Sequence, residues 1–211
     1  MYKGIIFDLD GVICFTDKYH YKAWKKLADR LGIYFDETIN NRLRGVSRMD
    51  SLDIILERSD KEYSEEEKIA FADEKNETYK ELLLLMNESD LSDEVRNTLQ
   101  ELRKRGFKLA IGSSSKNTKT ILDRIGLSDF FDAISDGTNI TKSKPDPEVF
   151  LKAAEFIGED PSECLVVEDA EAGIEAAYRG GFDSAGLGDA CKHQRVTYKM
   201  NKFSDLLEIT K

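Results

Sequence analysis

The sequence predicts an α/β protein, in which a parallel sheet is flanked by helices and a separate all-helical segment is inserted. Three observations support this prediction. The short apolar run from Ile5 to Phe7 is typical of a buried strand near the start of the chain. Residues 16–87 show helical spacing of apolar residues and no strand pattern. From Ser92 onward short apolar runs alternate with helical patterns, which is typical of a parallel sheet covered on both faces.

Length and composition limit the possible classes of protein. The chain has 211 residues, of which 40% are hydrophobic and 34% charged, so it can form one globular domain with an insert. No apolar stretch approaches the ~20 residues that span a bilayer. The net charge of −10 argues against a nucleic-acid partner, which would need a basic face. We expect small molecules as partners, and any phosphate site must be made locally positive by a metal and a few cations.

The cysteines and the first residues predict the compartment. Cys14, Cys164 and Cys191 are scattered, without the paired spacing of zinc sites or disulfide frameworks. The start of the sequence has no basic region followed by a long apolar segment, so we expect a cytoplasmic protein. We also expect a monomer.

Two carboxylates follow the first predicted strand. Asp8 and Asp10 are two residues apart, and in an extended chain such residues project to the same side. Two like charges at this range either raise one pKa or bind a cation, and hard oxygen ligands suit Mg²⁺. Asp and Gly11 are also common turn residues, so these residues alone leave a metal site and an ordinary turn equally open.

The segment after this strand reads as four helices. The first is predicted from Thr16 to Leu31, with Thr16 as the N-cap and Gly32 as the stop. Two more are expected over 36–43 and 47–58. The fourth begins at the capping box Ser64–Glu67 and runs to about residue 87. Its repeating positions at spacings of three and four are Ile69, Ala72, Asn76, Tyr79, Leu83 and Met86.

Polar side chains share one stripe of the first of these helices. Thr16, His20 and Trp24 lie four residues apart, which places them on one face. A lone histidine is usually a hydrogen-bonded residue in a partly buried seam. Because this helix begins six residues after Asp10, we favour a functional role for His20. Asn76, with Lys75 beside it, could contact a substrate or could simply mark the edge of an apolar stripe.

The remaining strands complete a Rossmann-like parallel sheet. They are expected at 107–111, 131–134 and 165–167, with helices between them. The predicted division is a catalytic core of residues 1–15 and 88–211 and a helical cap of residues 16–87.

Polar residues follow three of the predicted strands. The first strand ends at Asp8 and Asp10, the second at Ser113, and the fourth at Glu168 and Asp169. In an open parallel sheet, ligands bind beyond the carboxyl ends of the strands. Lys144 lies in a loop that could reach the same edge. Carboxylates that hold Mg²⁺, with hydroxyls and an ammonium that hold phosphate oxygens, together predict a phosphoryl-transfer site.

These motifs, in this order, resemble those of the haloacid dehalogenase-like phosphotransferases. Within that superfamily the cap residues and the Ser-Lys-Asn run resemble its hexose-phosphate mutases, and the likeness covers nearly the whole chain. The resemblance implies a Mg²⁺-dependent isomerase that interconverts β-glucose 1-phosphate and glucose 6-phosphate through an aspartyl phosphate and the 1,6-bisphosphate. The alternatives are a sugar-phosphate phosphatase with the same core and a non-catalytic Mg²⁺ or sugar-phosphate binding protein.

The resemblance also implies roles for individual residues. Asp8 would be the nucleophile and Asp10 the general acid and base, while Thr16 and His20 would hold Asp10 as the cap closes. Metal ligation would involve Asp8, Asp10, Glu168 and Asp169, with Glu168 supporting the metal shell. The catalytic set is Asp8, Asp10, Thr16, His20 and Lys144. The substrate and phosphate contacts would be Trp24, Gly45, Val46, Ser47, Arg48, Lys75, Ser113, Ser114, Ser115, Lys116 and Asn117.

Two positions depart from the pattern of the superfamily. Phe15 stands where an acidic residue is frequent, and Ser92-Asp93 replaces a Pro-Gly pair expected near the returning linker. Neither position is expected to be catalytic. Both bear on how the cap closes, and so on the ratio of mutase to phosphatase activity.

Overall fold

The computed structural model describes residues 2–43 and 46–211. It contains a six-stranded sheet with the order β3-β2-β1-β4-β5-β6, and all five pairings are parallel. The strands are β1 Gly4–Phe7, β2 Lys108–Gly112, β3 Ala133–Ser135, β4 Cys164–Glu168, β5 Asp183–Gly186 and β6 Tyr198–Lys199. The predicted α/β class with a parallel sheet is therefore confirmed.

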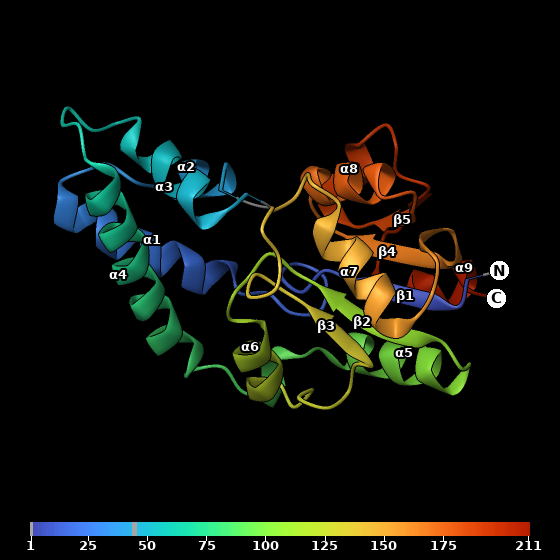
Figure 1. Ribbon diagram of the computed structural model, residues 1–211. Coiled ribbons are helices and arrows are strands. Elements are labelled where there is room, and N and C mark those ends of the chain that lie inside the picture. The colour runs from blue at the N-terminus through green and yellow to red at the C-terminus, as the bar shows by residue number, and fades with distance from the viewer. Residues whose placement is uncertain (1, 44–45) are drawn as a thin grey trace.

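The helices fall into two groups along the chain. The first group follows β1 and consists of α1 Asp17–Leu31, α2 Glu37–Asn41, α3 Arg48–Leu56 and α4 Glu65–Leu83. The helices that accompany the sheet are α5 Asp93–Lys104, α6 Thr118–Arg124, α7 Glu148–Ile157, α8 Glu171–Arg179 and α9 Leu206–Ile209. Short 3₁₀ helices occur at η1 Glu88–Asp90, η2 Pro161–Glu163, η3 Gly188–Lys192 and η4 Phe203–Asp205. Figure 1 shows α1–α4 gathered to one side of the sheet and its helices.

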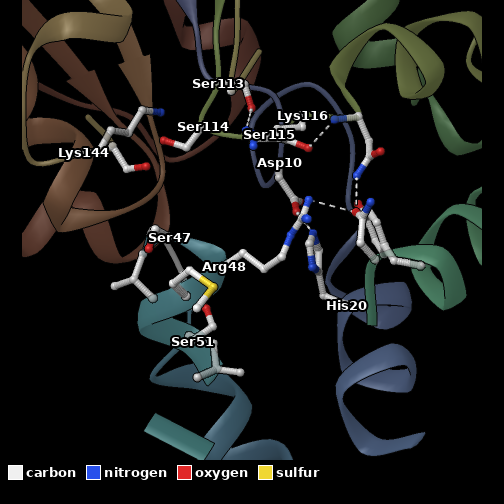
Figure 2. Close-up of a pocket in the computed structure, with 18 of the residues that line it drawn as sticks. Asp10, His20, Ser47, Arg48, Ser51, Ser113, Ser114, Ser115, Lys116 and Lys144 are labelled. Carbon is white, nitrogen blue, oxygen red and sulfur yellow. Dashed lines mark hydrogen bonds and ion pairs between the residues drawn. The ribbon is translucent and has the colours of Figure 1, made fainter. Parts of the chain in front are cut away.

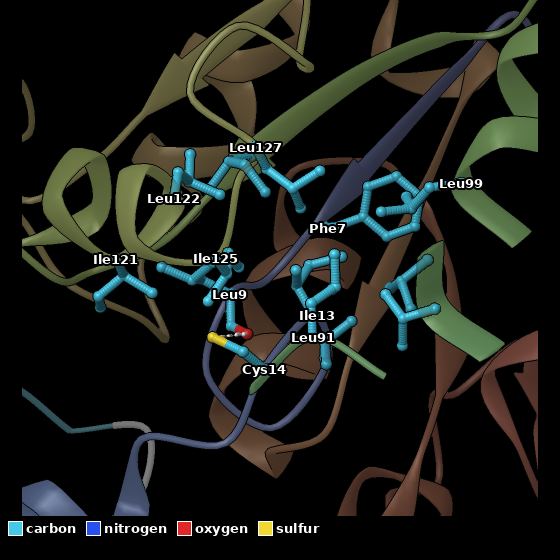
Figure 3. Close-up of a cluster of buried hydrophobic side chains, with 14 of the residues drawn as sticks. Phe7, Leu9, Ile13, Cys14, Leu91, Leu99, Ile121, Leu122, Ile125 and Leu127 are labelled. Atoms are coloured by element: carbon cyan, nitrogen blue, oxygen red, sulfur yellow. Dashed lines mark hydrogen bonds between the residues drawn. The ribbon is translucent and has the colours of Figure 1, made fainter. Parts of the chain in front are cut away.

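Alternating side chains on the central strands build a core on each face of the sheet. Ile5 and Phe7 of β1 join a cluster that includes residues of α5 and α6, and Figure 3 shows Phe7 beside Leu99 there. Ile6 points the other way, into a cluster formed with α7 and α8. Because successive side chains of a strand face opposite sides, one short apolar run supplies both cores.

The helices α1–α4 have an apolar cluster of their own. It is centred on Trp24, Leu27 and Leu52, and none of its residues belongs to the two clusters of the sheet. The capping box of Ser64 and Glu67 at the start of α4 is present as predicted. A separate core is what a distinct cap would require, while the domain boundaries at 15–16 and 87–88 remain a prediction.

Several details differ from the expectations. Thr16 stands at the N-cap position of α1 but makes no side-chain cap hydrogen bond, because its hydroxyl is directed to Asp10. Ile69 is 52% exposed, so the buried stripe of α4 begins only at Ala72. Two strands, β5 and β6, were not predicted. β5 reads Asp-Ser-Ala-Gly and β6 has two residues, so neither carries the β-branched pattern that signals a strand.

None of the helices in the described ranges combines the length and apolar composition needed to cross a membrane.

Two adjacent leucines at the end of α4 test how this helix is anchored to the sheet cluster. Leu83 is fully buried in the cluster that contains Phe7, whereas Leu84 is 62% exposed. We expect Leu83→Ala to lower the free energy of unfolding in urea by about 2–5 kcal/mol, because it removes buried methyl groups and leaves a cavity. Leu84→Ala is the matched control and should change it by no more than ~0.5 kcal/mol. Equal effects of the two substitutions would contradict this account of the packing.

Candidate active site

The site lies where the strand order reverses direction along the chain. β1 is central, and the chain continues to β2 and β3 on one side of it and to β4, β5 and β6 on the other. Phe7 pairs with Val167, so the residues that follow β1 and β4 emerge side by side. Crevices at such switch points, beyond the carboxyl ends of the strands, are the usual ligand sites of parallel sheets. Asp8, Glu168 and Asp169 meet here, with carboxylate oxygens within 4.8 Å of one another.

Lys144 ties two of these carboxylates together. Its ammonium lies 2.5 Å from Asp8 Oδ1 and 2.5 Å from Glu168 Oε1, and all three side chains are buried. Burial by itself lowers the pKa of Lys144, but the charges of Asp8 and Glu168 outweigh this effect, so the pKa is raised and the ammonium stays charged. Glu168 Oε2 accepts hydrogen bonds from the backbone N–H groups of Asp169 and Ala170 at 2.9 Å. Both oxygens of Glu168 are therefore already engaged by the protein.

The charges at this edge are unbalanced. Asp8, Asp10, Glu168 and Asp169 face one buried lysine. Burial, followed by the charges of Glu168, Asp8 and Asp10, raises the pKa of Asp169 to about 8. Carboxylates crowded in this way favour a cation, and an all-oxygen set suits Mg²⁺. Asp8 and Asp169 are the carboxylates best placed to be ligands, since Glu168 is held by other partners.

Glycine permits the close approach of Asp10 and Asp169. Gly11 has φ of +90°, which favours glycine, and a Cβ on it would lie 2.1 Å from Asp169 Oδ2. The chain can therefore turn directly after Asp10 without displacing Asp169.

Asp10 is held by the start of α1. Its Oδ1 accepts from the backbone N–H of Thr16 at 2.8 Å, and its Oδ2 accepts from the Thr16 hydroxyl. His20 Nε2 lies 3.5 Å from the same Oδ2. Burial raises the pKa of Asp10 to about 6 although the hydrogen bonds from Thr16 oppose this shift. The side chain is 34% exposed, and the exposed part faces the pocket, whose walls limit its hydration.

A chain of polar contacts continues from Asp10 into the helices. Lys75 Nζ lies 2.9 Å from His20 Nδ1. A charged Lys75 can only donate, and in that state Nδ1 accepts and the ring hydrogen is on Nε2, the nitrogen that faces Asp10. Burial and then the charges of Lys75 and Arg48 hold the pKa of His20 well below its usual range, so the ring is neutral. Tyr79 stacks on His20 with ring centroids 4.1 Å apart, and its hydroxyl donates to Thr16 Oγ1 at 3.0 Å. His20 and Thr16 are thus fixed by residues of α4.

Lys75 is a buried cation within this network. It is 3% exposed, and its ammonium lies 4.7 Å from the ring centroid of Trp24 and 4.6 Å from that of Tyr79. Burial and the nearby charge of Arg48 lower the pKa of Lys75 to about 7. The two ring faces favour the charged form and so oppose this shift. Trp24 is therefore placed against Lys75 within the helical core.

The lining of the pocket also includes groups suited to a second anion. Arg48, at the start of α3, donates to Asn76 Oδ1 at 2.9 Å, and Asn117 Nδ2 donates to the same oxygen at 3.0 Å. Figure 2 shows Arg48 reaching from the helices toward the loop that carries Ser115 and Lys116. The guanidinium is half-buried, and among the described residues no carboxylate forms an ion pair with it.

The serine run also lines the pocket. Ser113 Oγ accepts from the Ser115 N–H at 3.2 Å, and Ser115 Oγ accepts from the Asn117 N–H at 3.1 Å. The Ser114 hydroxyl is buried and has no hydrogen-bond partner within the described part of the chain. A buried hydroxyl without a partner is costly, and a ligand oxygen at this position would satisfy it.

A single pocket of about 730 Å³ brings most of the predicted site residues together. Those that line it are Asp8, Asp10, His20, Trp24, Val46, Ser47, Arg48, Lys75, Ser113, Ser114, Ser115, Lys116, Asn117, Lys144, Glu168 and Asp169. Thr16 does not line the pocket; it is buried, and its hydroxyl donates a hydrogen bond to Asp10. Gly45 lies outside the described residues.

Sequence reasoning gave Tyr79 of α4 no site role and left the role of Asn76 open. Tyr79 fixes both Thr16 and His20, and Asn76 joins Arg48 to Asn117. The signal was present, because Lys75, Asn76 and Tyr79 lie at helical spacings that place them on one face. What was missing is that this face meets Asp10 and the serine loop, which only the packing of α4 against α1 and α6 decides.

Comparison with known proteins places the chain among enzymes of phosphate chemistry. It is 40% identical over 206 residues to β-phosphoglucomutase of Bacillus subtilis, covering 97% of this chain and 91% of that protein. The crystal structure of β-phosphoglucomutase from Clostridium difficile is 38% identical, with a TM-score of 0.92, and the match covers 100% of this chain and 96% of that one. A fructose-1-phosphate phosphatase of Escherichia coli, YqaB, is 32% identical over 87% of this chain and 95% of its own.

The family comparison agrees with the motifs at the sheet edge. Residues 2–181 match the family described as haloacid dehalogenase-like hydrolase, which spans the sheet edge, the four inserted helices and the serine loop. The superfamily expected from the order of Asp8, Ser113, Lys144 and Glu168-Asp169 is thereby confirmed. The chain belongs to the haloacid dehalogenase-like hydrolase family.

Proposed function

We propose that the protein catalyses Mg²⁺-dependent phosphoryl transfer that interconverts β-glucose 1-phosphate and glucose 6-phosphate through the 1,6-bisphosphate. One observation carries the proposal: a single pocket holds two separate sets of anion-binding groups. Asp8 with its partner Lys144, Ser113 and Ser114 line this pocket together with Arg48, whose guanidinium forms no ion pair with a carboxylate of the described residues. A sugar with two phosphates needs two such sites, and a guanidinium suits bidentate phosphate binding. The similarity to two β-phosphoglucomutases supports the same activity.

The proposed reaction uses Asp8 as a nucleophile. A carboxylate oxygen of Asp8 attacks phosphorus, the bond between phosphorus and the sugar oxygen breaks, and Asp10 donates a proton to that oxygen. In the return transfer, Asp10 removes the proton from the other sugar hydroxyl, and that oxygen takes the phosphoryl group from Asp8. A pKa of about 6 suits Asp10 to both directions near neutral pH.

The residues at the sheet edge fit a divalent cation. Asp8, Asp169 and the backbone carbonyl of Asp10 would hold Mg²⁺, with Glu168 supporting this arrangement through its contacts with Lys144 and the N–H of Asp169. When bound, Mg²⁺ would offset the negative charge of the transferring phosphoryl group. Lys144 would bind a phosphoryl oxygen from the other side of Asp8.

The helical segment of residues 16–87 would act as a cap that closes over the substrate. Thr16 and His20 would hold Asp10 and so couple its position to α1, while Lys75 and Trp24 would line the side of the sugar pocket. Val46 and Ser47, next to Arg48, would follow the same movement. Closure excludes water, which limits hydrolysis of the phosphorylated Asp8.

We further propose that the protein works as a monomer in the cytoplasm. Cys14, Cys164 and Cys191 are free thiols, as is usual in a reducing compartment.

Product analysis tests the proposed reaction. With β-glucose 1-phosphate, Mg²⁺ and a trace of the 1,6-bisphosphate, we expect glucose 6-phosphate as the main product by ³¹P NMR. Asp8→Ala should reduce this turnover by roughly 10⁴-fold or more, because it removes the nucleophile. Circular dichroism would show that the variant is folded. Release of mainly inorganic phosphate would instead identify a phosphatase, as the similarity to the Escherichia coli enzyme allows.

Arg48 should matter only for substrates with a second phosphate. Arg48→Ala is expected to lower kcat/KM of the mutase reaction by about 10- to 100-fold, the cost of a lost charge-assisted hydrogen bond. Hydrolysis of p-nitrophenyl phosphate, which has no second phosphate, should change by less than about twofold. Arg42→Ala is the control, since Arg42 lies in the same segment but pairs with Glu57 at the surface. Equal losses with both substrates would refute the assigned role.

The buried ammonium of Lys75 predicts a dependence of stability on pH. Its pKa is about 7 in the folded protein, against a reference value of 10.5. Between these values the unfolded chain binds more protons at this position, so the free energy of unfolding of the wild type should rise with pH. The slope relative to Lys75→Met should be at most about 1.4 kcal/mol per pH unit.

Urea unfolding of both proteins from pH 6 to pH 9 measures this difference. Any stability advantage of Lys75→Met should be largest near pH 6 and shrink above pH 7. Lys80→Met, at an exposed position on the same helix, serves as the control. A difference between wild type and Lys75→Met that does not vary with pH would contradict the prediction.

A further inference from the structure

Asn76 occupies a junction between the inserted helices and the sheet. It lies on α4, is 8% exposed, and its Oδ1 accepts two hydrogen bonds. One comes from Arg48 Nη2 at 2.9 Å, at the start of α3, and the other from Asn117 Nδ2 at 3.0 Å, immediately before α6. The dashed lines in Figure 2 include the bond from Arg48. A single oxygen thus joins two donors that belong to different parts of the fold.

The chemistry of the donors fixes the orientation of both amides. A guanidinium can only donate, so Asn76 must present its oxygen to Arg48. Because Asn117 meets the same oxygen, it must present its amide nitrogen. Each donor retains further N–H groups after these bonds are made, so Arg48 and Asn117 can both still bind an anion.

The acceptor is neutral, and this matters for the charge of the site. Arg48 is half-buried, and burial lowers its pKa, while the charges of Asp73 and Glu77 oppose that change. Within the described ranges no carboxylate lies close enough for an ion pair with it. Asn76 therefore orients the guanidinium without neutralising it. A carboxylate at the same place would compete with a phosphate for Arg48.

We propose that Asn76 is a positioning residue for the phosphate that does not react. It holds Arg48 of the helical segment and Asn117 of the core in one arrangement, so that both donors face the same phosphate group of a hexose phosphate. This inference rests on the proposed function, because it concerns the second anion site of that reaction. Asn76 touches the donors rather than the reacting atoms.

Substitutions at position 76 test the proposal through binding. Asn76→Asp keeps the shape of the side chain and adds a charge that pairs with Arg48. We expect it to weaken glucose 6-phosphate binding, measured by isothermal titration calorimetry, by about tenfold or more. Asn76→Ala leaves both donors unheld and should weaken binding by a smaller factor. Hydrolysis of p-nitrophenyl phosphate by both variants should stay within about twofold of wild type.

A double substitution separates positioning from general structural damage. In an Arg48→Ala background, Asn76→Asp should have little further effect on glucose 6-phosphate binding, because its effect acts through the guanidinium. Asn97→Asp, on the exposed face of α5, controls for one added negative charge and should bind like wild type. Circular dichroism and urea unfolding would show whether each variant is folded.

Each outcome bears on a distinct claim. Unchanged glucose 6-phosphate binding by both Asn76 variants would overturn the inference alone. Fully additive effects of Arg48→Ala and Asn76→Asp, or equal losses with p-nitrophenyl phosphate, would show a structural role and also overturn it. Failure of the wild-type protein to bind glucose 6-phosphate would overturn the proposed function, and the inference would fall with it.

Discussion

The ion pairs of Lys144 with Asp8 and Glu168 are the interaction on which the site depends. Burying carboxylates at the ends of adjacent parallel strands costs free energy unless a cation shares the space. Lys144 offsets part of this cost, and the two N–H groups at the start of α8 hold the second oxygen of Glu168. Gly173 makes room for that side chain, since a Cβ there would lie 2.0 Å from Glu168. Asp8 and Asp169 are left facing the pocket with surplus negative charge, which suits a metal.

The inserted helices are tied to this edge through α6 as well as through Asp10. Arg124, at the end of α6, donates to the backbone carbonyls of Met86 and Leu84 just after α4, at 2.9 and 2.7 Å. At the other end of α6, Asn117 bonds to Asn76 in the middle of α4. The short helix that follows the serine loop therefore contacts α4 at two points. Any movement of the helical segment would therefore shift the groups that we propose bind the second phosphate.

Much of the fold could be predicted because local patterns were strong. The apolar runs at Ile5–Phe7 and Leu165–Val167, the capping box at Ser64 and the helical spacing along α4 each reflect short-range physics. β5 was missed for the opposite reason: its Asp-Ser-Ala-Gly sequence has weak strand preference, and it is a strand because it pairs with β4. Thr16 stands at the predicted N-cap position, but the local sequence does not reveal that its hydroxyl donates to Asp10 instead of capping the helix.

By itself the sequence determined the parallel sheet, the all-helical insert and the acidic strand ends with Ser113 and Lys144, because parallel topology brings strand ends to one edge whatever the loops do. Tertiary structure decided which side chains of the inserted helices contact one another in the pocket. Only the packing of α4 against α1 and α6 places Tyr79 on His20, Lys75 between two rings, and Asn76 between Arg48 and Asn117. Except for Lys75 and Tyr79, which lie four residues apart on α4, these contacts join residues 28 to 59 positions apart, and no local preference encodes them. They arise because three apolar clusters fix the helices relative to the sheet.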